Sequence, residues 1–288
     1  MNRREFLKSS LFFSSSIAVL SMFNSINKTY PTRVEELDSY GMLIDVTKCI
    51  GCGSCYVACK IANNLPVESE NIPRASLDLS STRFTNVFTR RIGDKYRFVK
   101  IQCMHCIDPA CVAACTVGAM RKTETGAVVV DESKCVGCRY CMVACPFKIP
   151  RFQWDKQLAI VAKCTLCLNR LEKGIQPACA SVCPTNAIKF GKRKELIEEA
   201  WRRINNNEKY VKHVYGESEV GGTSILYISD VPFELLGFPK LPEYSLPSIT
   251  ENWFKYAVPS IITIGILLLG GAYLYNERLN KKRRVIYE

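Results

Sequence analysis

The sequence predicts an α+β fold with an extended C-terminal arm and one C-terminal transmembrane helix. Three observations support this prediction. Sixteen cysteines fall into four groups of four, strand-like segments lead into two of these groups, and an uncharged apolar stretch lies near the C-terminus. With 288 residues, the chain is long enough to bury a sizeable core in one or two domains. We therefore expect the cysteine groups to organise the rest of the fold.

One cysteine group has a spacing that is specific for iron–sulphur chemistry. Residues 135–146 read CVGCRYCMVACP, which is the C-x2-C-x2-C-x3-C-P run of bacterial ferredoxins. The first three thiolates of such a run bind one [4Fe–4S] cube, and the fourth binds a different cube. Gly137 suits a loop that wraps closely around a cluster, because glycine has no Cβ atom.

The other three cysteine groups have related short spacings. Ile44-Asp45 precedes the first group and Val130-Asp131 precedes the third, which indicates an internal repeat. No cysteine is left over, so all sixteen are candidate metal ligands. In chain order, the groups are Cys49, Cys52, Cys55 and Cys59; Cys103, Cys106, Cys111 and Cys115; Cys135, Cys138, Cys141 and Cys145; and Cys164, Cys167, Cys179 and Cys183.

Zinc sites and disulfides are the alternatives to iron–sulphur clusters. Zinc favours pairs of C-x2-C separated by a long gap, which does not explain three cysteines at successive short spacings. Cysteines so close together on a loop are also awkward to pair as disulfides. His105 lies within the second group, but a Rieske site needs two histidine ligands. We expect His105 to lie beside a cluster or on the surface.

The predicted ligand sets follow from the rule that the last cysteine of a run binds the neighbouring cube. Groups two and three are adjacent and form an inner module over residues 96–152. Groups one and four form an outer module over residues 41–66 plus 159–195. The fold is therefore expected to contain two interleaved two-cluster bacterial ferredoxin-like modules within residues 41–195. The sets are Cys49, Cys52, Cys55 and Cys183; Cys59, Cys164, Cys167 and Cys179; Cys103, Cys106, Cys111 and Cys145; and Cys115, Cys135, Cys138 and Cys141.

The formal net charge of +12 invites a nucleic-acid interpretation, which we reject. Each cluster with its four thiolates adds about −2, so four clusters bring the holo-protein to about +4. Aromatic residues do not alternate with lysine and arginine in a pattern that would stack bases. We expect no nucleic-acid partner.

Segments between the cysteine groups predict strands. Residues 84–90 and 96–101 alternate in polarity, and Gly93-Asp94 between them can turn a hairpin. Residues 127–131 form another strand-like segment, and residues 41–46 lead into the first group.

The part of the chain that follows the last cysteine predicts a helix and an arm over residues 196–250. Apolar residues recur near helical spacing within residues 192–212, which predicts an amphipathic surface helix with a solvated charged face. Residues 214–250 include several prolines and a strand-like segment at 224–228. We expect these residues to form an extended arm over the core or over a partner.

Residues 1–27 are expected to be a targeting segment and not part of the fold. Arg3-Arg4, Phe6-Leu7-Lys8 and a short apolar stretch resemble the twin-arginine export signal, so the twin-arginine translocase is an expected partner. This route exports folded proteins, and the clusters would thus be assembled in the reducing cytoplasm. An amphipathic helix or an uncleaved anchor is the alternative, and no A-x-A-like cleavage site is visible.

Residues 257–275 are apolar and uncharged, and a membrane span needs about 20 such residues. Trp253, Tyr256, Tyr273 and Tyr275 lie at the two ends of this stretch, as aromatic residues do at membrane interfaces. Residues 276–288 are basic, so the positive-inside rule predicts a cytoplasmic tail. The cysteine domain would then lie on the periplasmic or external side of the inner (cytoplasmic) membrane, held in the lipid bilayer by one span. A buried core helix is the alternative.

The spacings of the four groups resemble those of the four-cluster electron-transfer subunits of bacterial respiratory oxidoreductases. Such subunits occur in formate dehydrogenase, dimethyl sulfoxide reductase and membrane-bound hydrogenases. The resemblance covers nearly the whole chain. The export-like start, the single span and the segments 102–106, 137–146, 215–217 and 221–223 look most like the hydrogenase-2 iron–sulphur subunits.

This resemblance implies an electron-transfer subunit with four [4Fe–4S] clusters and no catalytic residues of its own. The implied partners are a catalytic oxidoreductase subunit, in the first place a hydrogenase, and an integral-membrane quinone-reactive subunit. The same relay in a formate dehydrogenase or a molybdopterin reductase is the alternative. A redox sensor or an assembly factor is a further alternative function, but neither needs four clusters and a membrane anchor. The chain contains no GxGxxG motif and no phosphate-binding loop.

Overall fold

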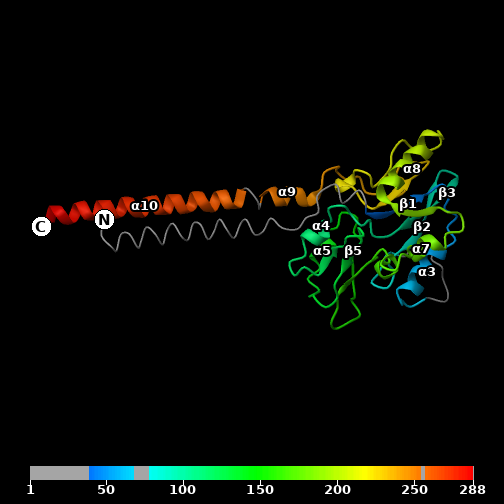
Figure 1. The fold of residues 1–288 in the computed structure, drawn as a ribbon, viewed down its shortest axis with the longest axis horizontal. Coiled ribbons are helices and arrows are strands. Elements are labelled where there is room, and N and C mark those ends of the chain that lie inside the picture. Colours follow the sequence, from blue (N-terminus) through cyan, green and yellow to red (C-terminus); the bar gives the residue numbers. More distant parts are fainter. Residues whose placement is uncertain (1–38, 68–77, 254–256, 288) are drawn as a thin grey trace. The chain divides into compact units, whose positions relative to one another are not determined.

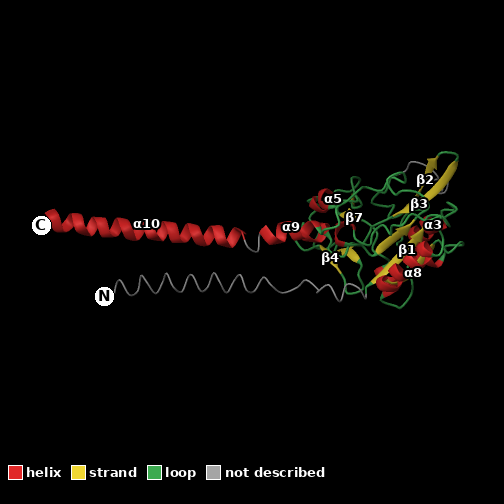
Figure 2. Ribbon diagram, turned by 90° about the horizontal axis from the view of Figure 1, so that it is seen from above, coloured by secondary structure: helices red, strands yellow, loops and turns green. Residues whose placement is uncertain are grey.

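The computed structural model describes residues 39–67, 78–253 and 257–287, and its elements are shown in Figure 1 and Figure 2. The predicted export segment, residues 1–27, lies outside the described residues. The described chain combines helices with short strands, as expected from the sequence.

A three-stranded sheet in the order β8–β1–β9 lies at the centre of the fold. Strand β1 (Tyr40–Asp45) pairs antiparallel with β8 (Ile188–Lys192) and parallel with β9 (Ile225–Ile228). Strand β9 comes from the segment that we expected to lie over the core as an arm. All four of its residues are buried, so this part of the segment belongs to the core itself.

The two faces of the central sheet pack against different parts of the chain. Successive side chains of a strand point to opposite faces. Leu43 and Leu226 therefore pack on the apolar stripe of α8 (Arg193–Asn205), which confirms the predicted amphipathic helix. Met42 and Ile44 pack on the other face in a core cluster that also contains cysteines of the predicted ligand sets.

Three antiparallel strand pairs accompany the central sheet within the described residues. The hairpin of β2 (Asn86–Ile92) and β3 (Lys95–Ile101) confirms the turn predicted at Gly93-Asp94. The other pairs are β4 (Met120–Lys122) with β5 (Val128–Val130), and β6 (Arg151–Phe152) with β7 (Val161–Ala162).

Short helices carry or follow the cysteines. They are α3 (Ser54–Ala62), α4 (Ala110–Ala113), α5 (Tyr140–Ala144), α6 (Leu168–Leu171) and α7 (Ala178–Ser181). Helix α3 packs against α7, and α4 packs against α5, as Figure 1 shows. These two contacts bring the first cysteine group to the fourth, and the second group to the third.

Towards the C-terminus, a 3-10 turn, η1 (Glu219–Gly221), and α9 (Leu246–Asn252) precede the long helix α10 (Val258–Tyr287). Within the described ranges, α10 alone is long and apolar enough to cross a membrane, over Val258–Lys281. Its large apolar side chains are exposed. The helix begins one residue after the start of the predicted span and continues through the basic residues that we expected to form a tail.

Candidate metal centres

Each cysteine group opens with a C-x-x-C turn whose third residue has a left-handed backbone. These residues are Gly51 (φ 70°), His105 (φ 46°), Gly137 (φ 69°) and Leu166 (φ 56°). The conformation costs a residue with a Cβ atom about 1–2 kcal/mol. The turn is therefore visible in the sequence at the two glycines, whereas at the other two positions the surrounding structure enforces it.

His105 is fully buried and does not lie on the surface. Its Nδ1 accepts a hydrogen bond from the Val128 backbone N–H at 2.9 Å. Burial, together with the positive charges of Lys163, Lys100 and Lys122, holds the imidazole pKa well below its usual value. His105 is therefore a neutral residue that ties the turn of the second group to strand β5.

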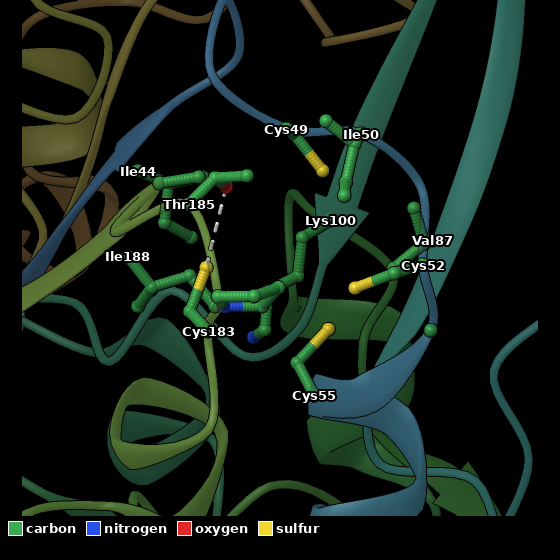
Figure 3. Close-up of a pocket in the computed structure, with 13 residues that line it drawn as sticks. Ile44, Cys49, Ile50, Cys52, Cys55, Val87, Lys100, Cys183, Thr185 and Ile188 are labelled. Carbon is green, nitrogen blue, oxygen red and sulfur yellow. Dashed lines mark hydrogen bonds between the residues drawn. The ribbon is translucent and has the colours of Figure 1, made fainter.

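The first predicted ligand set surrounds one pocket (Figure 3). The thiols of Cys49, Cys52, Cys55 and Cys183 point into it, and it encloses about 390 Å³, part of it open to solvent. Cys52 is exposed and Cys55 is buried. Burial raises the pKa of the Cys55 thiol to about 12.

Two further sets each line a pocket of their own. The pocket of about 300 Å³ is lined by Cys59, Cys164, Cys167 and Cys179, all of them buried. The pocket of about 330 Å³ is lined by Cys115, Cys135, Cys138 and Cys141, of which Cys138 is exposed.

The remaining set is Cys103, Cys106, Cys111 and Cys145. Burial raises the pKa of the Cys106 thiol well above its usual value, and the other three cysteines of the set raise it further. Three of the predicted sets thus each line a pocket of the structure. That the sixteen cysteines bind clusters in the four sets stays a prediction. Which iron each thiolate binds stays a prediction.

The chemistry of these donors fits iron–sulphur clusters. Thiolates that share a buried pocket disfavour one another's charge, so they need a cationic core, which the irons of a [4Fe–4S] cluster supply. A single zinc ion would need its four sulphurs about 3.8 Å apart. In the part of the chain that the structure describes, no group of three or more His, Cys, Asp or Glu side chains is arranged to hold one metal ion.

Backbone and side-chain N–H groups point at several cysteine sulphurs. The N–H of Leu166 donates to Cys164 Sγ at 3.4 Å, and that of Met120 donates to Cys115 Sγ at 3.3 Å. Asn63 Nδ2 donates to the Sγ of a third cysteine, Cys59, at 3.6 Å. Such hydrogen bonds stabilise the thiolate form and are one of the factors that set cluster potentials.

Cysteines of successive sets share core clusters. Cys55 and Cys179 lie in one cluster, Cys103 and Cys164 in a second, and Cys111 and Cys141 in a third. In this order the Cys49 set and the Cys115 set are the two ends of a row.

Exposure of the sixteen cysteines follows this order. Only Cys52 and Cys138 are exposed, and they belong to the two end sets. The cysteines of the two inner sets are buried or half-buried. The arrangement is that of a chain of sites with two accessible ends and a protected middle.

Comparison with known proteins agrees with this geometry. A family model described as a 4Fe-4S dicluster domain matches residues 95–193. The chain is also 34% identical to the hydrogenase-2 operon protein HybA of Escherichia coli O157:H7, over 88% of each chain. The chain belongs to the [4Fe–4S] electron-transfer subunits of respiratory oxidoreductases. The resemblance inferred from the cysteine spacing is thus confirmed.

Other relatives in this family work with different catalytic subunits. The iron–sulphur subunit of the nitrate-inducible formate dehydrogenase of Escherichia coli K12 is 37% identical over 77% of this chain and 80% of its own length. The thiosulfate reductase electron transfer subunit PhsB of Salmonella typhi is 39% identical over 60% of this chain and 85% of its own. With sixteen cysteines in four sets, this electron-transfer subunit carries four [4Fe–4S] clusters.

Proposed function

We propose that this chain relays electrons through its four clusters between a periplasmic catalytic subunit, in the first place a nickel–iron hydrogenase, and a quinone-reactive membrane subunit. The row of cysteine sets with Cys52 exposed at one end and Cys138 at the other carries the proposal. When bound, the clusters supply one-electron transfer. The protein supplies ligands, excludes water from the middle of the row and leaves both ends accessible.

The proposal assigns each cluster to one of the four cysteine sets in two interleaved modules. The inner module, residues 96–152, combines the second and third groups, and the contact of α4 with α5 supports this pairing. The outer module, residues 41–66 plus 159–195, combines the first and fourth groups, and the contact of α3 with α7 supports it.

The end of the row that contains Cys138 is proposed to face the membrane subunit. The Ser245 hydroxyl, one residue before α9, donates a hydrogen bond to Asp108, two residues before α4. Helix α9 also contacts α4, which in turn packs on α5 of the Cys115 set. The chain thus leaves the cysteine domain towards α10 beside this end, and Cys52 is left for the catalytic subunit.

Residues 257–275 are proposed as the single membrane span, with the C-terminus in the cytoplasm and the clusters on the periplasmic side. The apolar, exposed side chains of α10 support a lipid environment. The basic residues after the span support the sidedness. Residues 1–27 would direct export through the twin-arginine translocase.

The same relay in a formate dehydrogenase or a molybdopterin reductase is the second candidate. Relatives named as formate dehydrogenase and thiosulfate reductase subunits favour it, because their identity to this chain is as high as that of HybA.

Metal analysis of the intact complex separates the two candidates. The full chain would be purified anaerobically from solubilised membranes, and nickel and molybdenum would be measured per iron. We expect a nickel-containing partner and hydrogen-dependent quinone reduction. Molybdenum in the complex, together with activity on formate or an oxyanion, would support the second candidate and contradict the hydrogenase. A chain that carries no catalytic partner and transfers no electrons to quinone would contradict the relay itself.

A further inference from the structure

Lys100 is a buried lysine whose ammonium has no hydrogen-bond partner among the described residues. Its side chain is only 1% exposed. An unpaired ammonium is very unfavourable in a protein interior, so buried charges are paired or bound to a group of opposite charge. The surroundings of Lys100 must therefore supply a negative charge.

Strand β3 carries Lys100 to the pocket of the Cys49 set. Phe98 and Lys100 are two residues apart and lie on the same face of the strand. A Cβ atom on Gly51 would lie 2.4 Å from the Phe98 ring, so the first cysteine loop packs on this face. The Lys100 carbonyl accepts a hydrogen bond from the Tyr227 hydroxyl at 2.8 Å, which fixes the backbone at this point. Figure 3 shows the Lys100 side chain among the four sulphurs.

The residues that line this pocket contain no carboxylate. Apart from Lys100 they are cysteines, apolar residues and Thr185. The cysteines therefore supply the negative charge as ligands of an anionic cluster.

We propose that the Lys100 ammonium is the counter-charge of the cluster held by the Cys49 set, and that it raises the reduction potential of this cluster. Reduction adds one electron to an already anionic cluster, and a nearby positive charge stabilises that product more than the oxidised form. Lys100 thus tunes the cluster at the end of the row that contains Cys52. The inference rests on the proposed ligand sets.

Lys163 shows how a buried lysine is held when it does not need a cluster. Its ammonium donates hydrogen bonds to two backbone carbonyls, those of Val128 and, at 3.1 Å, Cys164. The contrast indicates that the fold can satisfy a buried ammonium with carbonyl groups, and that at Lys100 it does not do so.

The test is a redox titration of the full-length holo-protein, followed by electron paramagnetic resonance, in Lys100→Met. We expect an unchanged iron content and a lowered midpoint potential for the cluster of the Cys49 set, by at least a tenfold change in the one-electron equilibrium constant, about 59 mV. The other three potentials stay at wild-type values. Lys100→Arg keeps the charge and retains all four potentials. The matched control Lys95→Met, at an exposed position of the same strand, shifts none. Four wild-type potentials in an iron-replete Lys100→Met protein would overturn the proposal.

A second measurement decides the matter if Lys100→Met does not retain its iron. In wild-type protein labelled with ¹⁵N-lysine, pulsed electron paramagnetic resonance of the reduced clusters should detect a lysine nitrogen coupling that Lys100→Arg lacks. Absence of that coupling in the wild type would overturn the proposal. A wild-type protein with fewer than four clusters would instead contradict the ligand sets, so the two failures are distinguishable.

Discussion

The first and third cysteine groups make the same backbone turn as the second and fourth, but by different means. At Gly51 and Gly137 the left-handed conformation costs little, because glycine has no Cβ atom. At His105 and Leu166 the same conformation is held with side chains that are 0% and 1% exposed. The comparison teaches that the turn is a requirement of the cysteine site, and that glycine is needed only where no side chain can be packed.

Space explains which groups use glycine. A Cβ atom on Gly137 would lie 2.6 Å from the Ala159 carbonyl oxygen, and one on Gly51 would meet the Phe98 ring. In the other two groups the side chain points into the protein. Leu166 joins the main apolar core, and His105 binds the backbone of Val128.

The largest effect is expected from replacing the last cysteine of a full run, because this cysteine should bind the cluster of the neighbouring group. We expect Cys145→Ser to damage the cluster of the Cys103 set and to spare that of the Cys135 loop, because the fourth thiolate binds the other cube. Electron paramagnetic resonance spectra should lose the same cluster signal in Cys145→Ser as in Cys103→Ser. Cys141→Ser should lose a different cluster signal. Loss of the Cys141 component in Cys145→Ser would refute the shared-ligand scheme.

Truncation of Leu166 tests whether packing holds the turn of the fourth group. Leu166→Ala should cost about 2–5 kcal/mol because it leaves a cavity in the core. Leu166→Gly should cost no more than Leu166→Ala, since the relief of the left-handed backbone is about 1 kcal/mol. The temperature at which the cluster absorbance disappears measures both. A glycine variant clearly less stable than the alanine variant would show that the turn is not strained.

His105 tests the equivalent turn of the second group. His105→Ala should cost about 1–3 kcal/mol, because the buried N–H of Val128 loses its acceptor. His105→Asn should cost less, since asparagine tolerates the left-handed region and offers an acceptor. The same thermal measurement compares them, with wild-type cluster content as the control. Equal losses in both variants would argue that the imidazole matters for its volume only.

The smallest effect is expected at Arg139, which precedes α5 as Gly53 precedes α3. Both are left-handed, with φ of 65° and 76°. The Arg139 guanidinium lies 5.4 Å from the Phe152 ring centre and 5.2 Å from that of Trp154. Arg139→Gly removes backbone strain of about 1 kcal/mol and cation–π attraction of similar size, so the net change in stability should stay below about 1 kcal/mol. A larger loss would mean that the stacking determines the loop conformation.

Local patterns in the sequence could predict much of the fold. Alternation around Gly93-Asp94 predicted the β2–β3 hairpin, and the spacing of Leu196 and Ala200 predicted α8. Cysteine spacing also led to ligand sets of which three each line one pocket, because a cluster fixes the distances between its ligands.

Features that depend on distant contacts could not be predicted. The parallel pairing of β9 with β1 joins segments far apart in the chain, so no local pattern indicates it. The turns at His105 and Leu166 lack a glycine because the core holds them. Lys100 resembles any other lysine of a strand until the fold shows that it is buried beside the Cys49 set.

The central claim is that four clusters lie in a row with accessible ends. The most direct test is to measure iron and acid-labile sulphide in the anaerobically purified chain, with resonance spectra during stepwise reduction. The account predicts about sixteen of each per chain, and magnetic coupling between neighbouring clusters as the row fills with electrons. Zinc in place of iron, or clusters that stay magnetically isolated when fully reduced, would contradict it.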